Sequence, residues 1–148
     1  GHDEERRFLM EKEFVPMYGA EGWQLSNAPI LALAPYKASL DLFERAGFDN
    51  LRAKSVQLTG YLEFLIQELN QQGYAYEFIT PSHPDERGCQ LSELAKNEGK
   101  ALFDYLIENG VILDWREPNV IRVAPTPMYN TFEEVWRFVA LLKQYKAS

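Results

Sequence analysis

The chain has 148 residues, 46% of them hydrophobic and 14% aromatic, with a net charge of −7 and a pI of about 4.9. This composition is typical of one packed globular domain and excludes an intrinsically disordered chain. The acidic balance argues against non-specific binding to nucleic acids or anionic membranes, because both need a basic surface.

Residues 1–26 begin with a charged run and contain Pro16, Gly19 and Gly22. This pattern predicts an extended connector with at most one short strand. Residues 27–148 then form the folded domain. We expect its first part, residues 27–70, to be helical and its second part, residues 74–148, to mix helices and strands.

The segment SNAPILALAPYKASLDLFERAGF carries the signals of a first helix. Ser26 or Asn27 suits the N-cap position, and Pro29 suits the first turn because its fixed φ is helical. Gly47 is a good helix end. Pro35 lies inside the pattern and is expected to kink this helix or to split it in two.

The second helix has the clearest pattern in the chain. Its apolar stripe recurs at spacings of three and four residues, through Leu51, Ser55, Leu58, Leu62, Leu65 and Leu69. Such a stripe predicts one helix face packed in the core, and it needs no cofactor to explain it. Gly73 ends the pattern.

Four strands and one helix follow before the last helix. YAYEFIT predicts a strand from Tyr74 to Thr80, PSHPDERG a loop, and GCQLSEL a shorter strand whose far end is uncertain after Ser92. EGKALFDYLIENG predicts a helix closed by Gly110. VILDW, the four-residue turn REPN and VIRVA predict a β-hairpin.

Thr131 and Glu134 have the spacing of a capping box, which opens the last helix, FEEVWRFVALLKQYK. The order after residue 48 is therefore α-β-β-α-β-β-α. It predicts an α/β (α+β) fold, a two-layer sandwich with helices packed on one face of a small, mainly antiparallel sheet.

Arg122 is the one conspicuous candidate for a site. It interrupts the apolar run VIRVA, and a charge there must reach water or find a partner. If its face of the sheet is open, Arg122 is an ordinary surface residue. If the face is covered, its planar guanidinium suits the two-point binding of a carboxylate. Arg116 is expected to be exposed and to pair weakly with Asp114.

Other chemistry-bearing residues favour structural roles. No glycine-rich phosphate loop and no metal-ligand spacing occurs in the sequence. His83 in its polar loop predicts turn chemistry, and Cys89 predicts a small buried hydrophobe. One cysteine allows no internal disulfide and fits a reducing compartment. With no apolar membrane span and a charged N-terminus unlike a secretory signal, we expect a cytoplasmic protein.

Four long strings nevertheless resemble the C-terminal part of kynureninases, in order and spacing, over nearly the whole chain. These strings are GWQLSNAPI, KSVQLTGYLEFLI, ITPSHPDERGCQLS and DWREPNVIRVAPTPMYNTFEEVWRF. The resemblance implies the small domain of a fold-type I enzyme that uses pyridoxal 5′-phosphate, together with the connector from a large cofactor-binding domain. Such enzymes are homodimers that hydrolyse L-kynurenine or 3-hydroxykynurenine to L-alanine and an anthranilate in tryptophan catabolism, on the kynurenine route to NAD.

By the same resemblance, Arg122 matches the arginine that binds the substrate α-carboxylate, and Asn27 matches an asparagine that lines the cofactor and substrate site. The family's Schiff-base lysine has no counterpart among the seven lysines of this chain. We therefore expect the 148-residue chain on its own to be inactive and to hold no cofactor covalently. Two alternatives remain, a stand-alone module that binds a small carboxylate through Arg122 and a dimerisation domain.

Overall fold

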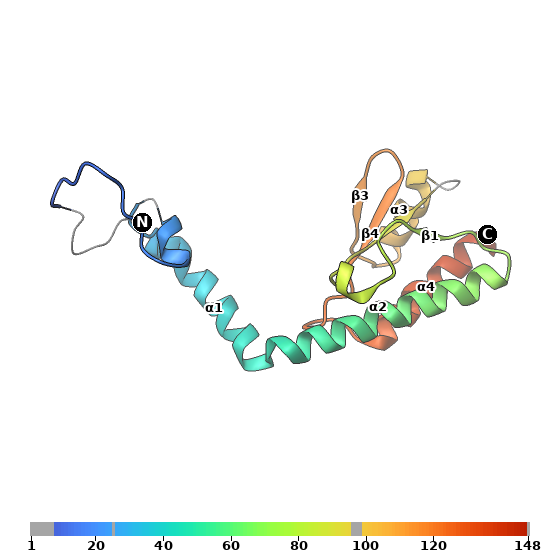
Figure 1. Cartoon of the computed structure of the whole chain (residues 1–148). Coiled ribbons are helices and arrows are strands. Elements are labelled where there is room, and N and C mark those ends of the chain that lie inside the picture. Colours follow the sequence, from blue (N-terminus) through green and yellow to red (C-terminus); the bar gives the residue numbers. More distant parts are fainter. Residues whose placement is uncertain (1–7, 25, 96–98, 148) are drawn as a thin grey trace. The chain divides into compact units, whose positions relative to one another are not determined.

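The computed structural model describes residues 8–24, 26–95 and 99–147 (Figure 1). The chain divides into two compact units, Gly1–Arg45 and Ala46–Ser148. No helix within the described residues is both long and apolar enough to cross a membrane. The second unit contains all four strands of the described chain and carries Arg122.

The first unit contains the 3-10 helix η1 (Ala20–Trp23) and nearly all of helix α1 (Ile30–Ala46). Ser26 and Asn27 were the predicted N-cap residues, and this prediction is wrong. The carbonyl of Pro29 accepts the first helical N–H groups, from Ala32 and Leu33, both at 3.0 Å. A residue before proline is disfavoured in helical conformation, so the helix cannot begin ahead of Pro29.

Pro35 lies inside α1 without splitting it, since the helix is continuous to Ala46. The ring removes only one backbone donor, close to the helix start. Gly47 follows with φ 79°, in the left-handed region that favours glycine, and so confirms the predicted helix end. No residue of α1 is buried.

The second unit has the predicted order of elements. Helix α2 (Phe48–Gln71) is followed by β1 (Glu77–Phe78), the 3-10 helix η2 (Pro84–Glu86), β2 (Leu91–Leu94), α3 (Gly99–Glu108), β3 (Asp114–Arg116), β4 (Val120–Val123) and α4 (Phe132–Ala147). The sheet has the order β1-β2-β4-β3 and every pairing is antiparallel. The α+β fold with a small antiparallel sheet is confirmed.

One face of the sheet forms the core with the helices. Leu91, Ile121 and Val123 are buried on it, and their neighbours in sequence point the other way. Tyr76 and Ala95, which flank strands, also belong to this core. Helices α2, α3 and α4 supply the other buried residues, which are Leu58, Leu62, Ile66, Leu69, Leu102, Leu106, Val135, Phe138, Val139 and Leu142. The predicted core role of the α2 stripe is confirmed. The sequence did not predict Glu93, whose side chain is fully buried on this same face.

Strand β1 is much shorter than the predicted Tyr74–Thr80 strand. At both of its ends, side chains make the backbone hydrogen bonds that a neighbouring strand would otherwise make. Asn70 accepts from the backbone N–H of Tyr76 at 2.9 Å and donates to the Tyr76 carbonyl at 2.8 Å. At the other end, the Thr80 hydroxyl accepts the Ser92 N–H at 2.9 Å. Backbone groups satisfied in this way need no strand partner.

The hairpin differs from the prediction in its register. Arg116 pairs with Val120 inside the ladder, so the turn consists of residues 117–119 and not of the four residues REPN. The peptide bond between Glu117 and Pro118 is cis. With a turn of three residues, Asp114 lies opposite Arg122.

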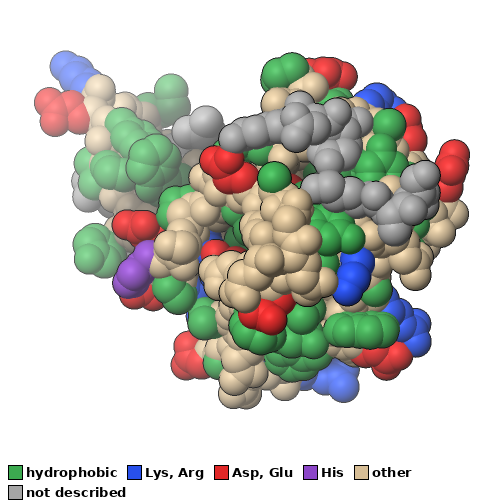
Figure 2. All heavy atoms as spheres, turned by 90° about the vertical axis from the view of Figure 1, so that its right-hand side faces the viewer, with side chains coloured by type: hydrophobic (Ala, Val, Ile, Leu, Met, Phe, Trp, Pro, Cys, Tyr) green, Lys and Arg blue, Asp and Glu red, His purple; other side chains and the backbone are tan. Residues whose placement is uncertain are grey.

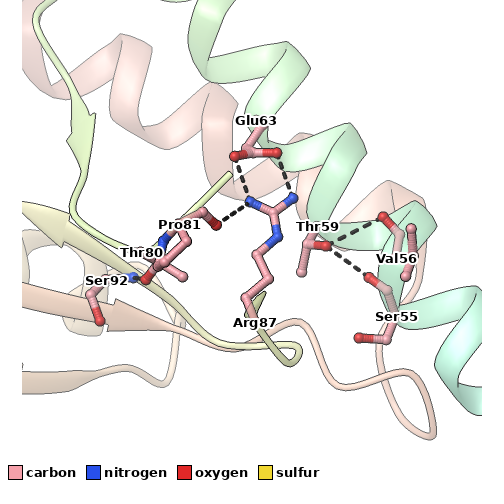
Figure 3. A network of polar contacts seen from close by, with 8 residues as sticks. All are labelled: Ser55, Val56, Thr59, Glu63, Thr80, Pro81, Arg87 and Ser92. Atoms are coloured by element: carbon pink, nitrogen blue, oxygen red, sulfur yellow. Dashed lines mark hydrogen bonds and ion pairs between the residues drawn. The ribbon is translucent and has the colours of Figure 1, made fainter. Parts of the chain in front are cut away.

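The loop between β1 and β2 is fixed to α2 by Arg87 (Figure 3). Its guanidinium donates to both carboxylate oxygens of Glu63, at 2.5 and 2.6 Å, and to the Pro81 carbonyl at 3.3 Å. The Arg87 side chain is only 3% exposed, and the hydrogen bond that it donates to Glu63 raises the pKa of Arg87. Arg52 of α2 also donates to the Pro84 carbonyl in this loop. Two arginine contacts thus hold an otherwise irregular segment.

Charged side chains of both signs are interspersed with apolar ones over the face drawn in Figure 2, and no continuous basic surface appears among the described residues there. Within the described part of the chain, no group of three or more His, Cys, Asp or Glu side chains is arranged to hold a metal ion.

We predict that replacing Glu63 with alanine lowers the free energy of unfolding by about 3 kcal/mol, because the buried Arg87 loses its charge partner. The matched control is Asp104→Ala, which removes an exposed pair with Lys100 and is expected to change stability by less than about 1 kcal/mol. Urea unfolding of the whole chain measures both. Equal losses would contradict the anchoring role of Arg87.

The capping box yields a prediction for acid stability. The Thr131 N–H donates to Glu134 at 2.7 Å and the Glu134 N–H donates to the Thr131 hydroxyl at 3.2 Å, which confirms the predicted box. The Thr131 backbone hydrogen bond, more than any other contact, lowers the pKa of Glu134 below its ordinary value of 4.5. The ionised carboxylate therefore stabilises the fold above that value, and this contribution is lost as the pH falls through the lowered pKa.

We accordingly expect Glu134→Gln to unfold at a lower temperature than the parent chain at neutral pH, with the difference shrinking as the pH falls below about 4. Thermal unfolding followed by circular dichroism between pH 3 and 7 measures this. A difference that stays constant over that range would show that the carboxylate charge plays no part in the cap.

Candidate functional site

Arg122 lies on the face of the sheet turned away from the core, which we call the outer face. Its cross-strand neighbours there are Ser92 on β2 and Asp114 on β3. The alternation of a strand explains this position, since Ile121 and Val123 on either side are buried. The Arg122 side chain is 32% exposed, so it neither lies in the core nor extends freely into water.

Asp114 holds the guanidinium of Arg122 through one of its oxygens. Arg122 Nε donates to Asp114 Oδ2 at 2.5 Å, and Arg122 Nη2 contacts the same oxygen. Arg116 Nε lies 3.2 Å from that oxygen as well. The sequence predicted the weak Arg116–Asp114 pair but not the Arg122–Asp114 pair. We call these three residues the outer-face charge cluster.

The contact leaves one edge of the Arg122 guanidinium available. Asp114 occupies the side formed by Nε and Nη2, while Nη1 has no hydrogen-bond partner among the described residues. A guanidinium carries five N–H donors, and the Nη1–Nη2 edge alone can make two parallel hydrogen bonds to a carboxylate. The arrangement therefore favours an anionic ligand that approaches end-on.

Ser92 adds a hydroxyl beside Arg122. Its backbone N–H is held by the Thr80 hydroxyl, so the Arg87-anchored loop ends directly at the strand position opposite Arg122 (Figure 3). Sequence reasoning missed both Arg87 and Ser92. Only the strand register reveals Ser92, and no local pattern marks Arg87 as buried.

Asn27, the other predicted site residue, is exposed in the segment before α1. Asn27 belongs to the first compact unit and Arg122 to the second. Its predicted role toward a cofactor and substrate stays a prediction.

The two other residues considered have ordinary surroundings. His83 accepts the Asp85 N–H through Nδ1 at 3.3 Å, which confirms its predicted turn role. Cys89 is a half-buried free cysteine.

A groove of about 720 Å³ lies beside α4 and is lined by residues such as Glu134, Val135 and Arg137. Arg122 is not among its lining residues.

Covalent attachment of a carbonyl cofactor requires a lysine whose amine can form a Schiff base. Of the seven lysines, the side chains of Lys96 and Lys146 lie outside the described residues, which leaves five. Four of these are bound by other groups: Lys37 by Asp41, Lys54 by the Pro127 carbonyl, Lys100 by Asp104 and Lys143 by Gln72. Lys12 is exposed. None of the five is a buried amine of the kind that attacks a carbonyl.

Comparisons with known proteins show the family of this chain. A model of the family described as "Kynureninase C-terminal domain" matches residues 51–142. Kynureninases from Flavobacterium psychrophilum and Flavobacterium johnsoniae are 51% and 52% identical to this chain over 97% of its length, and that from Stenotrophomonas maltophilia is 54% identical over 94%. The chain spans about a third of the length of these relatives, 33–34%.

Among solved structures, a NifS-like protein matches with a TM-score of 0.64 at 17% identity, covering 90% of this chain and 39% of that one. At this identity the likeness concerns the fold alone. The matched family segment runs from α2 to α4 and contains the sheet with the outer-face charge cluster. The chain belongs to the kynureninase C-terminal domain family.

Proposed function

We propose that this chain is the substrate-carboxylate part of a kynureninase. The intact enzyme would hydrolyse L-kynurenine, 3-hydroxykynurenine or both to L-alanine and anthranilate or 3-hydroxyanthranilate in tryptophan catabolism. The observation that carries the proposal is the available Nη1–Nη2 edge of Arg122, within a segment that matches the family model. A guanidinium edge of this kind matches the α-carboxylate of an amino acid.

The chain's own residues would bind and orient the substrate. Arg122 would hold the carboxylate by two parallel hydrogen bonds, which fixes the substrate relative to the reacting carbon and lowers the entropic cost of the reaction. The anchored β1–β2 loop and the register with β2 would keep Ser92 beside that carboxylate. Asn27 would line the cofactor and substrate site from the first unit.

Pyridoxal 5′-phosphate in the intact enzyme would supply the electron sink that carbon–carbon bond cleavage requires. The described residues fit the carboxylate end of such a site, but the described lysines do not fit the attachment of the cofactor. As the resemblance to kynureninases implies, the Schiff-base lysine would belong to a separate large domain. Residues 1–26 would connect that domain to the small domain, 27–148, in a cytoplasmic homodimer.

A second candidate is a stand-alone binding or dimerisation module. Helix α1 favours it, because the helix buries no residue and exposes large apolar side chains, with Ile30 77% and Leu31 91% exposed. Apolar surface of this kind marks an association site. This alternative requires carboxylate binding or self-association by the chain alone, without any pyridoxal chemistry.

The role of Arg122 is tested in a chimaera in which this chain replaces the aligned third of the Flavobacterium johnsoniae kynureninase. We predict that Arg122→Lys lowers kcat/KM for kynurenine by about tenfold or more, mainly through KM, because lysine cannot make the two-point contact. Arg137→Lys, an exposed arginine on α4, is the matched control. Parental kinetics from Arg122→Lys would refute the assignment.

The absence of covalent cofactor attachment is tested with the chain itself. We expect no stoichiometric adduct after incubation with pyridoxal phosphate and borohydride reduction, and no anthranilate fluorescence with kynurenine, because the described lysines are bound elsewhere or exposed. Mass spectrometry of tryptic peptides measures the adduct. One site-specific adduct accompanied by turnover would show that a lysine of this chain is the catalytic one.

A further inference from the structure

We propose that Asp114 sets the charge selectivity of the Arg122 site, so that the site accepts a monoanionic carboxylate and disfavours a dianion. This inference rests on the proposed carboxylate-binding role of Arg122. It assigns a task to a residue that touches the arginine and need not touch the reacting atoms of a substrate.

The first argument is the charge of the cluster. One carboxylate oxygen of Asp114 lies against Arg122 Nε and Nη2 and 3.2 Å from Arg116 Nε. Two guanidinium groups and one carboxylate give a net charge of +1 on this part of the outer face. A single carboxylate ligand brings that charge to zero, whereas a dianion leaves an excess negative charge beside Asp114.

The second argument is geometry. Asp114 takes the Nε side of the guanidinium and leaves the Nη1–Nη2 edge, so Asp114 and an end-on ligand bind the same cation at adjacent positions. Their mutual repulsion increases with the charge of the ligand. Asp114 therefore discriminates by charge without blocking the edge that a carboxylate needs.

Two other carboxylates in this sheet and its hairpin turn, those of Glu77 and Glu117, repel a ligand at Arg122 less than Asp114 does. Glu77 is on the outer face but on β1, two strands away from Arg122 in the sheet. Strands are spaced by about 4.8 Å, so this separation is about 10 Å and exceeds the Debye length of about 8 Å at physiological salt. Glu117 in the turn accepts the Trp115 indole N–H at 2.9 Å, and Trp115 pairs with the buried Ile121, so this carboxylate is directed toward the opposite face of the sheet. Asp114 is thus the carboxylate whose charge the ligand meets first.

The test is a titration of the whole chain with acetate and with malonate at pH 7.5 and a constant ionic strength of about 0.15 M, followed by NMR of the backbone amides and arginine Nε–H groups. Asp114→Asn keeps the size of the side chain and removes its charge. Unit charges about 4 Å apart in water change affinity by about fivefold. We expect acetate to bind about fivefold more tightly to Asp114→Asn and malonate by a larger factor, at most about 25-fold, because its second charge lies farther from Asp114.

Asp104→Asn is the matched control, because it removes one negative charge from an exposed pair on α3. It should leave the malonate-to-acetate affinity ratio unchanged. Arg116→Gln provides an independent check that leaves Arg122 and Asp114 in place. It should weaken malonate binding more than acetate binding, because the cluster then loses one positive charge.

The outcomes separate this inference from the proposed function. If Arg122→Gln leaves acetate binding unchanged, Arg122 is not the carboxylate site and the proposed function loses its support. If Arg122→Gln abolishes binding but Asp114→Asn strengthens acetate and malonate equally, or weakens both, the selectivity role is overturned while the carboxylate site stands. An increase of about two- to fivefold in the malonate-to-acetate affinity ratio in Asp114→Asn, without such an increase in Asp104→Asn, supports the inference.

Discussion

The two-residue alternation of β4 is the constraint on which the rest of the second unit depends. Ile121 and Val123 are buried in the core, and this fixes Arg122 on the opposite face without any further determinant. The same central strand pairs with β2 on one side and β3 on the other. One short apolar strand therefore organises both the core and the candidate site, and a slip of one residue would exchange the two faces.

Helix α2 supports this sheet in two ways. Its apolar stripe packs under the sheet, while Arg52, Lys54 and Glu63 contact the backbone or side chains of the two loops that enter β2 and leave β4. Lys54 donates to the Pro127 carbonyl at 2.7 Å. The irregular segments around the outer face are thus tied to a rigid element, which is what a binding site needs to keep its donors in place.

The outer-face charge cluster gives the carboxylate proposal a physical basis within an acidic protein. The whole chain carries a net charge of −7, yet two arginines and one aspartate meet on this face and leave a local positive charge. Local arrangement, and not overall composition, decides whether an anion is attracted at short range. Membership of the kynureninase C-terminal domain family makes an amino acid carboxylate the ligand that we propose for it.

The sequence by itself determined the order of the elements, the core face of α2, the capping box at Thr131 and the prominence of Arg122, because these depend on local periodicity and on cap chemistry. The start of α1 depended on Pro29, which is also a local feature of the sequence. The tertiary structure decided the length of β1, through side chains such as Asn70 that replace a strand partner. It also decided the Arg122–Asp114 pair, through a hairpin turn one residue shorter than predicted. The burial of Arg87 against Glu63 joins residues 24 positions apart, and contacts of that kind leave no periodic signal in a sequence.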